Sequence, residues 1–93
     1  MEEKIRELFD LCWRVTNETD CYVSFNIASH TLCCYIDVMD SKWEAGKEYD
    51  GYYCIYFGNE MFEEESLEHY KLAKAHLLRL LINGRCPLNE SNG

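Results

Sequence analysis

The sequence predicts a two-layer α+β sandwich with the element order α-β-β-β-α. Apolar residues recur at helical spacing near both ends of the chain, and between these segments they alternate with polar residues at a period of two. A short turn between the first two alternating runs favours an antiparallel hairpin. Both helices can bury their apolar stripes on one face of a three-stranded antiparallel meander. We expect one domain over residues 1–84 and a flexible tail over residues 85–93.

The first helix is predicted from an apolar stripe that begins close to the N-terminus. The stripe consists of Ile5, Leu8, Phe9, Cys12 and Val15, which follow the spacing of one helix face. Glu2 and Glu3 in the first turn and Arg14 in the last turn interact favourably with the helix dipole. The polar run over residues 16–20 then ends the helix.

Three strands follow, separated by a turn at Ser29 and His30 and by a longer loop over residues 39–51. The side chains expected to face the helices are Val23, Phe25 and Ile27, then Leu32, Cys34, Ile36 and Val38, and finally Tyr53, Ile55 and Phe57 of a third strand over residues 52–57. Because side chains alternate between the two faces of a strand, the residues between these positions point away from the helices.

The second helix is long and carries its own apolar stripe. The stripe consists of Leu67, Tyr70, Leu77, Leu78 and Leu81, and Ala73 flanks it. Asn59 or Ser66 could cap its start, and Asn83-Gly84 followed by Pro87 predicts its end. His69 and His76 are seven residues apart, whereas a helical metal pair requires a spacing of three or four. We therefore expect both histidines on a solvated helix face.

The sheet face away from the helices is expected to display the tyrosines Tyr22, Tyr35, Tyr52 and Tyr56. Tyrosine is enriched at interfaces because it combines a large contact area with a polar tip. Tyrosines also fit pleated strands and shield their backbone without any partner. Trp43 in the long loop presents a similar choice. We favour its folding back to seal one edge of the core, because large apolar rings are rarely left exposed, and contact with a partner is the alternative.

Acidic residues dominate the segment between Lys47 and Lys71, which contains no basic residue. The seven acids are Glu48, Asp50, Glu60, Glu63, Glu64, Glu65 and Glu68. Together with the net charge of -8, they argue against direct binding of nucleic acid or an anionic membrane and favour a basic protein surface. We take these acids, Trp43 and the four tyrosines as candidate partner-binding residues.

No motif in the sequence indicates catalysis, a cofactor or a metal ion. We find no nucleophile with a recognisable base, no paired acids and no glycine-rich phosphate loop. The chain is therefore expected to be non-enzymatic. The N-terminus opens directly into an amphipathic helix, which is unlike a signal peptide, so we expect a cytoplasmic protein.

The six cysteines are expected to be free thiols, buried or half-buried, rather than zinc ligands or disulfides. There is no Cys-x-x-Cys motif, and the adjacent Cys33 and Cys34 point to opposite faces of a strand. We expect Cys33 and Cys54 to be exposed on the face away from the helices and Cys34 to lie in the core. A metal site or disulfides are the less favoured alternatives.

The element order resembles that of the double-stranded-RNA-binding domain. That family grips phosphates with a basic start to its second helix, whereas residues 60–65 here are rich in glutamate. The resemblance therefore covers topology only, and the acidic charge of this segment excludes the usual function of binding RNA.

The chain also resembles the small acidic proteins encoded by phages and prophages of low-GC Gram-positive bacteria. The resemblance lies in the helix over residues 1–9, the join over residues 17–20, the loop over residues 43–50 and the glutamate-rich start of the last helix. It implies an inhibitor of the anti-CRISPR type, acting in the host bacterial cytosol as a DNA mimic. Its carboxylates would occupy the basic groove of a CRISPR effector nuclease. The alternative is a structural or assembly module that forms a homodimer through its tyrosine-rich sheet face.

Overall fold

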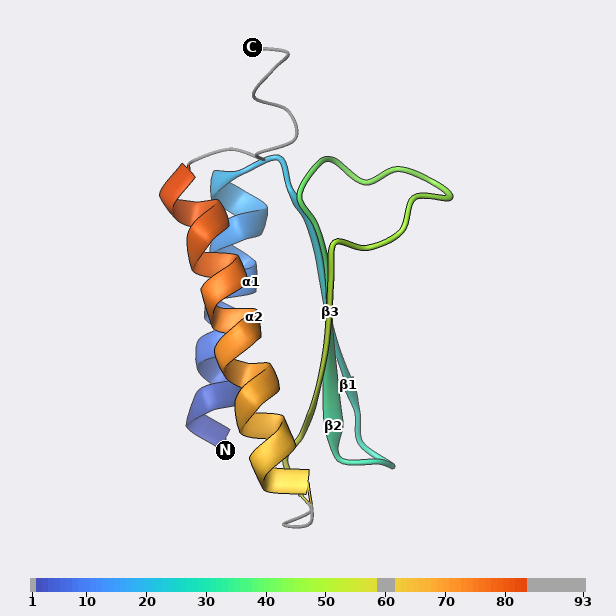
Figure 1. Ribbon diagram of the computed structural model, residues 1–93, viewed down its shortest axis with the longest axis vertical. Helices are drawn as coiled ribbons and strands as arrows, with labels where there is room; N and C mark the ends of the chain where they lie inside the picture. The colour runs from blue at the N-terminus through green and yellow to red at the C-terminus, as the bar shows by residue number, and fades with distance from the viewer. Residues whose placement is uncertain (1, 59–61, 84–93) are drawn as a thin grey trace.

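The computed structural model describes residues 2–58 and 62–83 and confirms the α+β fold in the order α-β-β-β-α. Helix α1 covers Glu2–Glu18, strands β1, β2 and β3 cover Tyr22–Ala28, Cys33–Met39 and Gly51–Tyr56, and helix α2 covers Glu63–Asn83. The strands form an antiparallel sheet in the order β1-β2-β3. Both helices cover the same face of this sheet (Figure 1). The predicted tail over residues 85–93 lies outside the described residues.

The core lies between the two helices and the sheet, with β2 at its centre. The buried side chains of this core are Leu8, Leu11, Cys12, Val15, Cys21, Cys34, Ile36, Val38, Ile55, Ala73, Leu77 and Leu80. Cys34, Ile36 and Val38 of β2 are completely buried, as their alternation predicts. Burial of one large aliphatic side chain stabilises a protein by about 1.5–3 kcal/mol, so this strand anchors the layer packing.

Helix α1 is rotated relative to the predicted stripe. Leu8, Cys12 and Val15 of that stripe are buried as predicted and Leu11 is buried in addition, whereas Phe9 is 47% exposed. Phe9 still contacts the ring of Phe25 edge-on, with 5.5 Å between centroids. The helix packs against both α2 and β1. Its buried face therefore points into the angle between two neighbours, a direction that periodicity alone does not give.

Two further boundaries differ from the prediction. Leu32 belongs to the turn between β1 and β2, where it has a φ of 51° and is 45% exposed, instead of lying in a strand. Ser66 lies inside α2 and does not cap its start. The other expected cap, Asn59, falls outside the described residues.

Side chains of α2 cover the outer edge of β3. The backbone N–H of Tyr56 donates to the hydroxyl of Ser66 at 3.0 Å. The Nδ1 atom of His69 lies 2.6 Å from the carbonyl oxygen of Cys54, and it donates the hydrogen because a carbonyl can only accept. Ser66 and His69 therefore satisfy the backbone of an edge strand, and His69 is not on a solvated helix face as predicted.

The rotation of α1 can be tested by truncating one side chain on each side of it. Leu11→Ala should lower the free energy of unfolding by about 2–3 kcal/mol, because it leaves a cavity in the core. Phe9→Ala should cost at least about 1 kcal/mol less, because half of that ring is already in water. Urea unfolding followed by circular dichroism measures both values. A larger cost for Phe9→Ala would mean that α1 buries the face that the spacing alone predicts.

Candidate functional site

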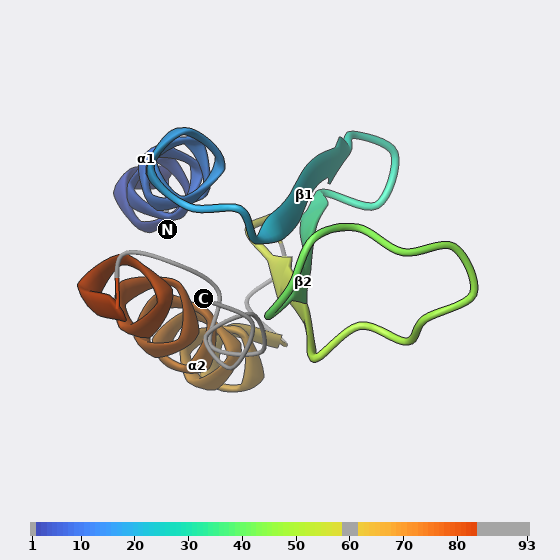
Figure 2. The same ribbon diagram turned by 90° about the horizontal axis from the view of Figure 1, so that it is seen from above.

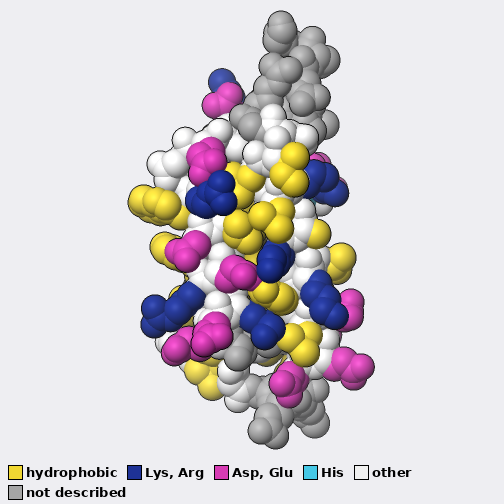
Figure 3. Space-filling view, turned by 90° about the vertical axis from the view of Figure 1, so that its left-hand side faces the viewer, with side chains coloured by type: hydrophobic (Ala, Val, Ile, Leu, Met, Phe, Trp, Pro, Cys, Tyr) yellow, Lys and Arg dark blue, Asp and Glu magenta, His cyan; other side chains and the backbone are white. Residues whose placement is uncertain are grey.

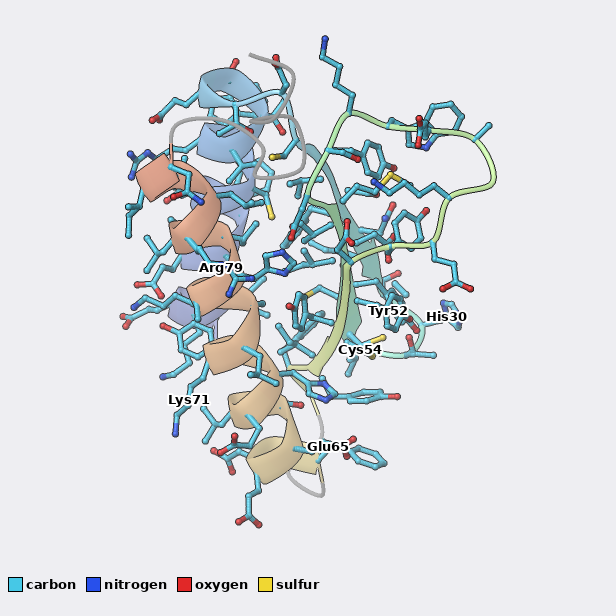
Figure 4. All side chains as sticks on the ribbon, turned by 45° about the horizontal axis from the view of Figure 1, so that its top comes forward. His30, Tyr52, Cys54, Glu65, Lys71 and Arg79 are labelled. Carbon is cyan, nitrogen blue, oxygen red and sulfur yellow. The ribbon has the colours of Figure 1, made fainter. Side chains whose placement is uncertain are left out.

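The sheet face opposite the helices forms a platform between two projecting segments. The loop over residues 40–50 projects at one end of this face, and the turn between β1 and β2 projects at the other (Figure 1). The strand register places on this face the side chains of Tyr22, Ser24 and Asn26, of Cys33, Tyr35 and Asp37, and of Tyr52, Cys54 and Tyr56. The four predicted tyrosines thus share one surface, which we call the tyrosine face. Figure 4 shows Tyr52 and Cys54 on the side of the sheet away from the helices.

Aromatic rings are paired along the tyrosine face. The pairs are Tyr22 with Tyr49 at 6.2 Å between centroids, Tyr35 with Tyr52 at 6.2 Å, and Tyr56 with Phe62 at 4.7 Å. Tyr52 is 58% exposed and Tyr49 is 46% exposed. Sequence reasoning missed Tyr49 and Phe62, because neither lies in a strand. Each reaches this face from a segment that flanks β3.

Asp37 is the one charged residue on the three strands. Its Oδ1 atom is buried and has no hydrogen-bond partner among the described residues. Burial raises the pKa of Asp37 above its ordinary value. Burial also raises the pKa of Tyr49, and the nearby charge of Asp37 raises it further. The centre of the tyrosine face therefore holds a partly buried carboxylate that has no counter-ion in the described part of the chain.

The predicted acidic residues do not form one patch. Glu48 and Asp50 lie in the loop at one end of β3, and Glu63, Glu64, Glu65 and Glu68 lie at the start of α2 beyond its other end. Six residues of strand separate these groups by about 20 Å. Asp50 accepts a hydrogen bond from the Asp40 N–H at 2.7 Å. Glu60 falls outside the described residues.

Among the acids at the start of α2, Glu65 is close enough to the tyrosine face for its charge to affect Tyr56. The pKa of Tyr56 is raised mainly by its hydrogen bond with Cys54, and the charge of Glu65 is among the smaller causes. In Figure 4, Glu65 lies at the start of α2 on the side towards the sheet. Negative charge therefore flanks the aromatic rings at both ends of the face.

Trp43 does not fold back over the core, contrary to the prediction, and is 58% exposed. The loop closes on itself without this ring: the Nζ atom of Lys47 donates to the hydroxyl of Ser41, which is only 8% exposed. Tyr49 stacks on Tyr22 at the base of the same loop. Trp43 thus belongs to the exposed aromatic residues around the tyrosine face.

The thiols follow the predicted faces but differ in exposure. Cys33 lies on the tyrosine face yet is completely buried, whereas Cys54 is half-buried. The Sγ atom of Cys33 lies 3.1 Å from the hydroxyl of Thr31. Burial alone would raise the pKa of Cys33, but hydrogen bonds with Thr31, Tyr35 and Cys54 lower it overall. The expected exposure of Cys33 was wrong, because these neighbouring side chains cover its sulfur.

Four cysteines, Cys12, Cys33, Cys34 and Cys54, are free thiols as predicted. Cys21 is disulfide-bonded, which corrects the expectation for that residue, and Cys86 lies outside the described residues. Within the described ranges, no group of three or more potential ligand residues could hold a metal ion. Neither described helix combines the length and the apolar character needed to cross a bilayer.

A buried hydrogen-bonded chain joins the long loop to α2, and sequence reasoning missed it. His76 is only 4% exposed, so it is not on a solvated face as predicted. Its Nε2 atom lies 2.5 Å from Oδ1 of Asp40, and its Nδ1 atom lies 2.7 Å from the hydroxyl of Tyr53. The helical spacing of His76 with Ala73 and Leu80 is the signal that could have placed it in the core.

This chain of groups runs from a carboxylate through an imidazole to a phenol hydroxyl. Burial raises the pKa of Tyr53. A methyl group at Gly51 would lie 2.6 Å from Nδ1 of His76, so glycine is required for the close approach of these groups. We interpret the chain of hydrogen bonds as a structural tie between the loop and α2.

No known protein family matches the chain. No curated protein and no solved structure matches it either. Inference about its function therefore rests on its own residues and their geometry.

Thiol accessibility provides a test of which sheet face is open. Cys54 should react first with a thiol reagent in the native state, because it is half-buried. Cys34 and Cys12 should react last, because burial raises the pKa of each to about 12. Mass spectrometry of peptides from a labelling time course gives the order. Reaction of Cys34 before Cys54 would mean that the sheet faces the other way.

The buried carboxylate of Asp37 should make stability depend on pH. A folded-state pKa above the ordinary value of 3.8 means that ionisation destabilises the fold, so stability is lost as pH rises through this range. Asp37→Asn should therefore match the wild type near pH 3 and become more stable than the wild type at pH 7, where the Asp37 carboxyl is ionised. Urea unfolding at several pH values measures this, with the exposed Asp10→Asn as control. Destabilisation by Asp37→Asn at pH 7 would contradict the absence of a counter-ion.

Proposed function

We propose that the protein is a non-enzymatic binding protein that docks a basic protein surface on the tyrosine face. Asp37 is the observation that carries this proposal. Its buried oxygen has no partner among the described residues, and exposed rings of Tyr49 and Tyr52 lie near it. A lysine or arginine of the partner would supply the missing hydrogen bond and charge, and the rings would favour cation–π contact.

The distribution of charge supports a basic partner. Six of the eight basic residues in the described part of the chain lie on the helices, and the other two, Lys42 and Lys47, lie in the long loop. Figure 3 shows the helical side, where basic and acidic side chains are mixed. The strands of the tyrosine face contribute no basic residue. Flanking acids would attract a basic surface over a distance, and the desolvated rings would contribute most of the affinity.

The partner that we propose is the nucleic-acid groove of a host defence nuclease of the CRISPR effector class. Such a groove releases counter-ions when it meets negative charge, so a surface that presents carboxylates competes with nucleic acid for it. Glu48 at one end of the tyrosine face and Glu65 at the other place negative charge on both sides of the aromatic centre. In this proposal the protein is phage-encoded and acts in the bacterial cytosol.

A homodimer through the tyrosine face is the second candidate, favoured by the exposure of Tyr49 and Tyr52. Asp37 disfavours a homodimer, because a two-fold contact through the tyrosine face would bury two Asp37 carboxylates without a counter-ion in one interface. Analytical ultracentrifugation separates the two candidates. The basic-partner proposal predicts a monomer, and a dimer that Asp37→Asn strengthens would favour the alternative.

Inhibition of DNA cleavage by purified CRISPR effector nucleases tests the proposal. Tyr52→Ala and Asp37→Asn should each weaken inhibition by about tenfold, as expected for residues at the centre of an interface. Replacing Glu63, Glu64 and Glu65 with lysine should slow association and reduce its salt dependence. Leu72→Ala is the matched control, because Leu72 is 56% exposed on α2 and away from the tyrosine face.

Two results would contradict the proposal at different levels. Inhibition that survives both changes on the tyrosine face would exclude this face as the binding surface. The protein could instead inhibit no nuclease but capture other basic proteins, with Tyr52→Ala abolishing that capture. This result would exclude a nuclease as the partner and would still support a basic partner.

A further inference from the structure

The outer edge of β1 differs from that of β3, because no side chain of α2 covers it. The N–H of Tyr22 donates to the carbonyl of Ser41 at 3.0 Å, on the side of β2, and the carbonyl of Ala28 accepts from Thr31 in the turn towards β2. Backbone groups of successive strand residues point alternately to the two sides. The N–H and C=O groups of Val23, Phe25 and Ile27 therefore point away from the sheet.

These outward groups have no partner in the described part of the chain. Among the described residues, none of the backbone hydrogen bonds outside the helices and the strand ladder involves Val23, Phe25 or Ile27. Natural edge strands are commonly protected by charged residues or by proline. Strand β1 has neither, since its sequence from Tyr22 to Ala28 contains only apolar, tyrosine, serine and asparagine residues. The edge is thus chemically suited to pair with another strand.

An apolar groove of about 720 Å³ lies between α1 and this strand. Its floor and walls are formed by Ile5, Phe9, Phe25, Ile27 and Phe57, and charged residues Glu2, Arg6 and Asp10 line its rim. Ile27 is 60% exposed and Phe9 is 47% exposed, so the groove is open to solvent. The ring of Trp13, which is 64% exposed, stacks beside Phe9 at 6.5 Å between centroids and extends the apolar surface.

We propose that the β1 edge and this groove bind an extended segment of a partner protein, which adds a fourth strand to the sheet. The outward backbone groups select an extended chain, and the groove accepts its side chains at alternate positions. On the rim, Arg6 lies 4.0 Å from Glu2 and is locally neutralised. Asp10 on the rim forms no ion pair within the described residues. The segment that fits therefore carries alternate apolar residues together with lysine or arginine.

A second copy of this chain does not fit the same edge. Helix α1 packs over β1, and α2 packs over β3 (Figure 2). Pairing of β1 with its own copy would place two α1 helices over neighbouring strands, which lie about 5 Å apart. Packed helices require about 8–10 Å between their axes. A single strand without a covering helix meets no such obstacle, so the edge favours a linear segment.

A peptide probe tests this proposal independently of the tyrosine face. The probe is an acetylated and amidated peptide of about ten residues in which valine alternates with lysine and threonine. When it is titrated into the ¹⁵N-labelled protein, the amide signals of Val23, Phe25 and Ile27 should shift, and their hydrogen exchange should slow. The matched control peptide has the same side chains but carries N-methyl groups at the residues that would pair with β1. It should bind at least about tenfold more weakly, because it lacks the paired donors.

Variants of the protein give the second part of the test. Ile27→Lys should weaken binding at least about tenfold, whereas Ile82→Lys should leave it unchanged, because Ile82 is 82% exposed on α2. Asp10→Lys does not alter β1 and should weaken binding through charge alone. Circular dichroism verifies that each variant is folded.

Three results would overturn the proposal. These are no binding of the peptide by the wild type, equal binding of the N-methylated peptide, and shifts confined to Tyr35 and Tyr52. The last result would locate the peptide on the tyrosine face. Loss of nuclease inhibition with intact peptide pairing would instead contradict only the proposed function.

Discussion

The rest of the structure depends on one packing arrangement: both helices cover the same face of the three-stranded sheet. The apolar side chains of β2 are buried beneath those helices, which fixes the register, because a shift of one residue would turn them to water. Every residue between them must then point to the opposite face. The tyrosine face and its central Asp37 follow from this single packing choice.

Sequence periodicity predicts this arrangement well but not the exceptions to it. The alternation in β2 gives the correct faces for Cys34, Ile36 and Val38, because a strand has only two faces. A helix packed against two neighbours has no such binary choice, so Leu11 rather than Phe9 is buried in α1. The four tyrosines are also predicted on the correct face, because they lie in strands that have only two faces. The acids lie outside the strands, and the structure places them in two separate groups.

Buried polar residues account for the other differences between sequence and structure. Ser66 and His76 are buried because each has a hydrogen-bond partner in another element. A polar residue is read from sequence as exposed, since its partner is distant along the chain and cannot be identified. The reverse holds for Trp43, an apolar ring that stays exposed because Lys47 and Tyr49 close the loop without it.

The tie between Asp40, His76 and Tyr53 has a consequence for the loop that carries Trp43. Both ends of that loop are fixed, at Asp40 by the imidazole of His76 and at Asp50 by the backbone of Asp40. Ordering a free loop on binding costs about 0.5–1.5 kcal/mol for each side chain that is immobilised. A loop that is tied to the long helix at Asp40 has less conformational freedom to lose than a free loop, so a contact made by Trp43 would carry a smaller entropy cost.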